Sequence, residues 1–179
     1  TKYFNEIFGY MADGAMNPNF TESEFADVKK RYIEGLKADE KSVSSVAGRV
    51  TNALLFGKNH PNGEFVTEQT LNNVTLADVK QNYASYFVPE NAYLVVVGDV
   101  KFKDVKKQVE KLFKDWKKAS APVAKYPEPV DVAKTQIDFV DMPNAVQSEI
   151  ALVNTVNLKL TDKDYFAALI ANQILGGGG

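Results

Sequence analysis

The predicted fold of this chain depends most on one stretch, Asn91-Ala92-Tyr93-Leu94-Val95-Val96-Val97-Gly98-Asp99. Residues 92–97 are continuously apolar and rich in β-branched side chains, which is typical of a strand that other elements cover on both faces. Gly98 and Asp99 then interrupt the run, as turn residues do. We therefore predict a buried strand over residues 92–97.

Helical patterns occupy most of the sequence on both sides of this strand. Thr21, Thr75 and Thr161 each begin a capping sequence, in which the hydroxyl accepts a free backbone N–H and an acidic residue three positions later reaches back. Ser42 is a fourth cap. Apolar residues at spacings of three and four predict helices after each cap and over residues 3–16 and 103–116. The turn residues of segment 56–73 predict an extended loop.

Residues 137–139 and 146–154 alternate apolar and polar side chains, which predicts two strands of a second sheet that starts near Thr135. Between the two predicted sheets, residues 119–132 contain Pro122, Pro127 and Pro129, a composition typical of a semi-rigid linker. We place a domain boundary there. Strands and helices segregate along the sequence, which favours an α+β fold over a regular βαβ repeat.

The composition of the 179 residues excludes several classes of protein. The formal net charge is −2 and 45% of the residues are hydrophobic, which argues against a disordered chain and against a nucleic-acid-binding protein. Apolar runs are too short to span a membrane. With no Cys and one His, disulfides, thiolate sites and a two-histidine metal site are excluded. Because the chain begins at Thr1 and ends in four glycines, we expect a segment of a longer protein.

The sequence resembles the pitrilysin/insulinase family of zinc metallopeptidases, which includes the mitochondrial processing peptidase. An ordered series of short motifs along nearly the whole chain carries the resemblance. The series consists of Leu76-Ala77-Asp78-Val79, Tyr83, Tyr86-Phe87, Pro89-Glu90-Asn91-Ala92, Val95-Val96-Val97-Gly98-Asp99-Val100, the helix end from Phe113 to Trp116, the proline linker, Ala145-Val146-Gln147-Ser148, and Ile174-Leu175-Gly176-Gly177-Gly178.

The resemblance implies an α/β sandwich of the processing-peptidase kind, repeated and paired into a clamshell. Residues 1–118 would be the back half of one α+β domain, 119–132 the linker, and 133–179 the start of the next domain. The family's His-x-x-Glu-His zinc motif belongs to the front half of a catalytic domain and is absent from this chain. We therefore assign no catalytic and no metal-binding residue here, and expect zinc in the parent protein or its partner.

The resemblance also implies a third zinc ligand, a Glu followed seven residues later by a second Glu, on a later helix. Asp27 and Glu34 have that spacing, whereas aligning the helix on Phe25 puts Val28 and Gly35 at the two positions. We favour the Phe25 register, which predicts one of the family's non-catalytic repeats.

Three further features have a structural interpretation and a functional alternative. His60 is interpreted as a loop residue bonded to its own domain; the alternative is a contact with bound peptide or metal. The lysine-rich segment 101–118 is interpreted as a solvated helix face rather than a surface for anionic membranes. The glycines of 176–179 follow a helix instead of preceding one, so we interpret them as a helix end rather than a phosphate loop.

Three functions remain open from the sequence. The first is a segment of a zinc peptidase that encloses and cleaves unfolded peptides, with this segment as chamber wall and hinge. The second is a non-catalytic partner that binds peptide or completes the clamshell. The third is a structural assembly module. Partners would be the other half of the protein or a paired subunit, and bacterial relatives favour the periplasm or cell envelope. Residues that bind substrate are not identified.

Overall fold

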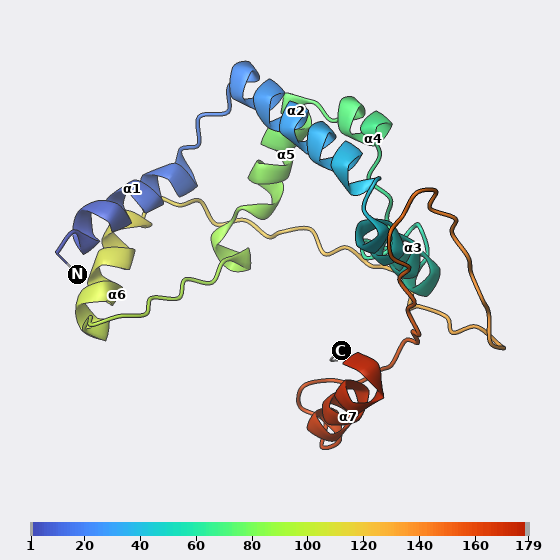
Figure 1. Cartoon of the computed structure of the whole chain (residues 1–179). Helices are drawn as coiled ribbons and strands as arrows, with labels where there is room; N and C mark the ends of the chain where they lie inside the picture. Colours follow the sequence, from blue (N-terminus) through green and yellow to red (C-terminus); the bar gives the residue numbers. More distant parts are fainter. Residues whose placement is uncertain (1, 178–179) are drawn as a thin grey trace. The chain divides into compact units, whose positions relative to one another are not determined.

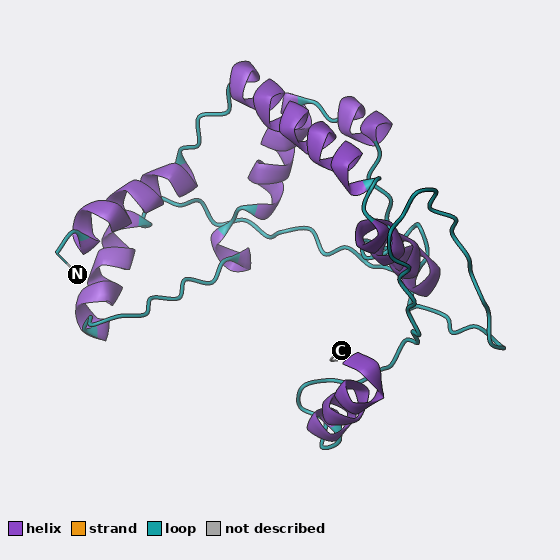
Figure 2. Cartoon of the chain, in the orientation of Figure 1, coloured by secondary structure: helices purple, strands orange, loops and turns teal. Residues whose placement is uncertain are grey.

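The computed structural model describes residues 2–177 and is built from helices joined by loops (Figures 1 and 2). Its helices are α1 (Phe4–Met16), α2 (Glu22–Asp39), α3 (Val43–Phe56), α4 (Glu68–Asn73), α5 (Leu76–Tyr86), α6 (Phe102–Leu112) and α7 (Tyr165–Asn172), with short helical turns η1 (Pro89–Asn91) and η2 (Gln173–Gly177). Within residues 2–177 no strand is formed.

The α+β prediction, with its α/β sandwich of the processing-peptidase kind, is therefore wrong. Residues 92–97 form a loop in which Tyr93 is 98% exposed and Val97 91% exposed. A strand requires a neighbour whose N–H and C=O groups pair with its own. No backbone hydrogen bond joins residues 93–97 to another described segment. The β-branched composition favours an extended backbone, but it supplies no such neighbour.

The predicted second sheet is wrong for the same reason. Residues 137–139 and 146–154 are loop throughout, and Leu152 is fully exposed. Alternation of apolar and polar residues defines which side chains would share a face of a sheet. This alternation stabilises a strand only when the apolar face of the sheet is buried against another layer.

The helix caps explain why the helices begin where they do. The hydroxyls of Thr21 and Ser42 each accept the backbone N–H three residues ahead, at 3.3 Å. At α5 the capping box is complete, because the Thr75 hydroxyl accepts the Asp78 N–H at 3.2 Å and the Asp78 carboxylate accepts the Thr75 N–H at 2.8 Å. The predicted helices at these three caps are confirmed, as is the helix over residues 3–16.

Two helix boundaries differ from the predictions. Helix α7 begins at Tyr165, several residues beyond the predicted cap Thr161. The Asp162 carboxylate accepts the Lys159 N–H at 2.8 Å and forms a turn before the helix. Helix α6 ends at Leu112 instead of Trp116.

The segment predicted as an extended loop contains α4 in its second half. The turn residues Gly57, Pro61 and Asn62 cover only the first part of that segment. A reciprocal cap between Thr67 and Thr70 then starts α4, with the Thr70 N–H donating to the Thr67 hydroxyl at 3.1 Å.

The described residues divide into two compact units, and the first comprises residues 2–41 and 66–125. A series of aromatic rings connects its helices, with centroids 5.0–6.1 Å apart, which is the usual range for favourable ring pairs. In spatial order the rings are those of Phe4, Phe8, Phe113, Trp116, Phe87, Tyr83 and Phe20. The Tyr83 hydroxyl also donates to the Ala15 carbonyl at 2.5 Å.

The second unit comprises residues 42–65 and 126–177, and it contains α3 and α7. The guanidinium of Arg49 on α3 lies 5.2 Å from the centroid of the Phe65 ring. The two units are groups of residues that contact one another within this chain. They do not test the domain division that we predicted, with its linker at 119–132, which therefore stays a prediction.

Candidate functional site

Helix α2 carries the residues considered above for the family's third zinc ligand. Phe25, Val28, Tyr32 and Leu36 recur at spacings of three and four, so they share one face of the helix. Leu36 is buried, Phe25 is half-buried, and Val28 is 40% exposed. The apolar face of α2 is therefore only partly covered.

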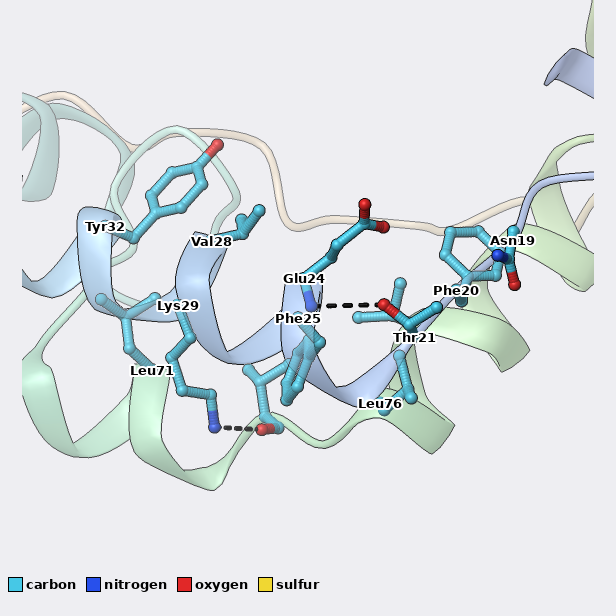
Figure 3. Close-up of a pocket in the computed structure, with 12 residues that line it drawn as sticks. Asn19, Phe20, Thr21, Glu24, Phe25, Val28, Lys29, Tyr32, Leu71 and Leu76 are labelled. Carbon is cyan, nitrogen blue, oxygen red and sulfur yellow. Dashed lines mark hydrogen bonds between the residues drawn. The ribbon is translucent and has the colours of Figure 1, made fainter.

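That face lines an apolar cleft of about 400 Å³, which we name the α2 cleft (Figure 3). The walls come from the turn before α2, from α2 itself, from the end of α4, and from the first turns of α5. The lining residues are Asn19, Phe20, Thr21, Glu24, Phe25, Val28, Lys29, Tyr32, Leu71, Val74, Leu76 and Val79. Ligand sites in proteins span about 300–1,000 Å³, so this volume suffices for a bulky apolar side chain and its neighbours.

Polar ties hold α4 against α2. The Lys29 ammonium donates to the carbonyls of Asn72 at 3.1 Å and Val74 at 2.5 Å, which satisfies acceptors that the end of α4 leaves free. Figure 3 shows Lys29 reaching from α2 toward this junction. Lys37 and Glu68 form an ion pair at 3.1 Å near the other end of α4. These ties fix the width of the cleft.

The chemistry of the lining suits binding better than catalysis. Ionisable groups are few: Glu24, Lys29 and Tyr32. The Lys29 ammonium is already bonded to two carbonyls, and the other walls are mostly hydrocarbon and aromatic surface. A ligand would gain free energy here chiefly by removing apolar surface from water, at about 25 cal/mol per Å².

The sequence predicted the helices that form the α2 and α5 sides of the cleft, but not α4, which forms part of the opposite wall. Leu71 and Val74 lie at the end of α4, which falls in the segment predicted as a loop. The signal that could have revealed them is the Thr67 cap followed by Thr70, because a threonine also completes a reciprocal cap.

The candidate zinc-ligand positions of the two registers lie on different faces of α2. Asp27 and Glu34 are exposed and absent from the cleft lining, and the Glu34 carboxylate lies 3.9 Å from the Lys30 ammonium. Val28, the ligand position in the Phe25 register, lines the cleft and offers no donor atom to a metal. In the part of the chain that the structure describes, no three His, Asp or Glu side chains converge as a metal site would require.

His60 lies in the loop after α3. Its ring stacks on Phe56 with centroids 5.1 Å apart and meets the Tyr126 ring edge-on at 5.5 Å. Its Nδ1 accepts the Asn62 N–H at 3.1 Å. These contacts are of the structural kind that we predicted for His60.

The lysine-rich segment presents charge to solvent from α6. Gln108 on the inner face donates to the Asn5 side chain of α1, and the Phe113 and Phe8 rings lie 6.1 Å apart. The α6 lysines are exposed, as expected of a solvated face. Of the glycine run, Gly176 adopts a φ of +136°, which favours glycine, in the turn after α7. Gly178 and Gly179 lie outside the described residues.

Comparison with known proteins identifies the class of protein to which this chain belongs. Residues 73–179, more than half of the chain, match the family described as the Peptidase M16 inactive domain. The chain therefore belongs to the M16 peptidase family, and the predicted pitrilysin/insulinase relationship is confirmed.

A curated relative then gives a closer comparison. The chain is 24% identical over 179 residues to the Non-peptidase homolog YmxG of Helicobacter pylori. The alignment covers 99% of this chain and 40% of the relative, so the chain spans less than half the length of that protein. Both comparisons support a non-catalytic member of the family. None of the helices described here is long and apolar enough to cross a membrane.

Proposed function

We propose that this chain is a non-catalytic M16 repeat that holds unfolded peptide and completes a clamshell whose hydrolytic half is another domain or subunit. The match to an inactive domain and the relative named a non-peptidase homolog support this function over the first hypothesis, a segment of a zinc peptidase. Because the chain spans 40% of that relative, its partner and the activity of the whole protein are part of the proposal.

One observation carries the peptide-binding part of the proposal. At the position of α2 where the Phe25 register expects a metal ligand, the chain has Val28, and Val28 lines an open apolar cleft. An unfolded peptide exposes large apolar side chains, and a cleft of about 400 Å³ can accept one of them. The same helix position would then serve peptide binding in place of metal binding.

Two further proposals follow from the family. The chain itself holds no zinc, and zinc belongs to the hydrolytic half. A periplasmic or cell-envelope location is proposed from bacterial members of the family.

A binding titration tests the peptide proposal. A short fluorescent peptide with one central Phe is titrated with the chain, alongside the same peptide with Ser in place of Phe. We expect the Phe peptide to bind at least about tenfold more tightly, because a buried Phe contributes about 1.5–3 kcal/mol. Val28→Asp should abolish the difference, since it places a carboxylate in the apolar cleft.

Ala26→Asp is the matched control, because it adds the same charge to α2 at an exposed residue outside the cleft lining. It should leave the affinity for the Phe peptide unchanged. Equal weakening by both variants would show a general effect of charge, and the cleft would lose its role. Cleavage of the peptide by the chain with added Zn²⁺ would contradict the non-catalytic assignment. Failure of both peptides to bind would favour a purely structural assembly module.

A further inference from the structure

The linker over residues 119–132 is tied to its surroundings at separate points. At its start, the Ala119 N–H donates to the Glu90 carboxylate at 3.0 Å. Farther along, the Tyr126 ring meets the His60 ring at 5.5 Å and an interplanar angle of 61°. Near its end, the Thr155 hydroxyl bonds to the Asp131 carboxylate. Between Ala119 and Tyr126 no hydrogen bond ties the described backbone to another segment.

The loop that presents His60 is closed tightly. Gly57 ends α3 with a φ of +79°, and the His60 N–H donates to its carbonyl at 3.1 Å. Gly63 approaches so closely that a Cβ at that position would lie 2.3 Å from the Gly57 carbonyl oxygen. The Asn62 N–H bond to Nδ1 then fixes the orientation of the imidazole. His60 is therefore held in place by contacts that do not involve Tyr126.

We propose that Phe56, His60 and Tyr126 form an aromatic clasp that fixes the linker at Tyr126 and limits the mobile part of the linker to residues 120–125. Phe56 supports one face of the imidazole, at 5.1 Å between ring centroids, while Tyr126 contacts it edge-on. The Asp131 tie holds the stretch beyond the clasp. The mobile part of the linker is then shorter than the whole proline-containing segment 119–132. The clasp does not depend on the peptide-binding proposal.

Backbone dynamics test the clasp directly. Steady-state ¹⁵N heteronuclear NOE values are measured on the whole chain for the linker amides. In the unaltered protein, residues 121 and 123–125 should show low values, and Tyr126 should show a value close to that of the α3 amides. His60→Ala should lower the Tyr126 value to that of Val123. His60→Phe should retain the ordered value, because a phenyl ring can stack on Phe56 and meet Tyr126.

Two controls separate the clasp from general loosening of the loop. Lys58→Ala alters the same loop without removing a ring of the clasp and should leave Tyr126 ordered. Tyr126→Ser removes the linker's side of the clasp while the 57–63 loop stays intact, so residue 126 should become mobile even if His60→Ala disturbs α3. If Tyr126 is as mobile as Val123 in the unaltered protein, or stays ordered in His60→Ala with α3 intact, the clasp is disproved.

Discussion

Val28 and Asp27 are neighbours on α2, but the helix turns by about 100° per residue, so their side chains point in different directions. Val28 joins the apolar face with Phe25, while Asp27 lies in solvent. The spacing of Asp27 and Glu34 alone suggested a zinc-ligand pair. Aligning the helix on Phe25 instead puts Val28 at the ligand position, on the face of α2 that the partly buried ring defines as inward. The choice of the Phe25 register stays a prediction.

Asp78 provides a pH-dependent prediction. Hydrogen bonds from Thr75, first from its hydroxyl and then from its backbone N–H, hold the pKa of Asp78 below its usual 3.8. The folded state therefore favours the carboxylate, and this contribution to stability is present above 3.8 and is lost as pH falls through the lower, folded pKa. Urea unfolding followed by circular dichroism should show part of the acid-induced fall in unfolding free energy disappearing in Asp78→Asn.

Removing the partner provides the cross-check. Thr75→Ala should flatten the same part of the pH dependence and also cost about 0.5–2 kcal/mol at neutral pH, as the loss of a threonine cap does. If the unfolding free energy of either variant falls with decreasing pH as steeply as that of the unaltered protein, the capping box does not contribute to this pH dependence.

At the level of elements, helices and strands differed in how far the sequence could specify them. Each helix at Thr21, Ser42 and Thr75 has its start signal and its hydrogen-bond partners within a few residues. The apolar run of 92–97 favours an extended backbone, but a strand also needs a pairing partner from another part of the chain. Local signals therefore predicted three helix starts correctly and produced a strand that the structure does not form.

Helix α4 shows a different limit. It is short, and the turn residues before it dominated the pattern of the whole segment. Isolated helices of this length are unstable in water, so tertiary contacts must hold it. Those contacts include the Lys29 bonds to the carbonyls of Asn72 and Val74 and the Lys37–Glu68 ion pair, which no local pattern reveals.

Lys29→Met should therefore weaken the attachment of α4 more than an equivalent change nearby. We expect a loss of about 1 kcal/mol in the free energy of unfolding, because two hydrogen bonds to a charged group disappear at an exposed site. Lys30→Met is the matched control, since Lys30 makes only an exposed pair with Glu34 at 3.9 Å and should change stability by less than about 0.5 kcal/mol. Chemical denaturation of both variants compares them, and equal losses would contradict the role of Lys29.

At the scale of the whole molecule, the linker is one of the segments that connect the two compact units, which are also joined along the chain between Lys41 and Ser42 and between Phe65 and Val66. Pro127 and Pro129 lie beyond the proposed clasp and restrict the backbone there. Replacing both with Gly should extend the mobile stretch and weaken peptide capture several-fold, while the melting temperature changes little because the linker buries little apolar surface. Thermal melts and peptide titrations on the same double variant check this. A large fall in melting temperature with unchanged affinity would show that the segment is a packed structural element.

The most direct test of the account locates bound peptide on the chain. The ¹⁵N-labelled chain is titrated with the unlabelled Phe peptide, and amide chemical shifts are followed together with the integrity of the peptide. We expect the largest shifts around Phe25, Val28 and Leu71, which face the cleft from α2 and α4, and we expect the peptide to stay intact. Shifts centred away from the α2 cleft, or cleavage of the peptide, would contradict the claim that this M16 repeat binds peptide without hydrolysing it.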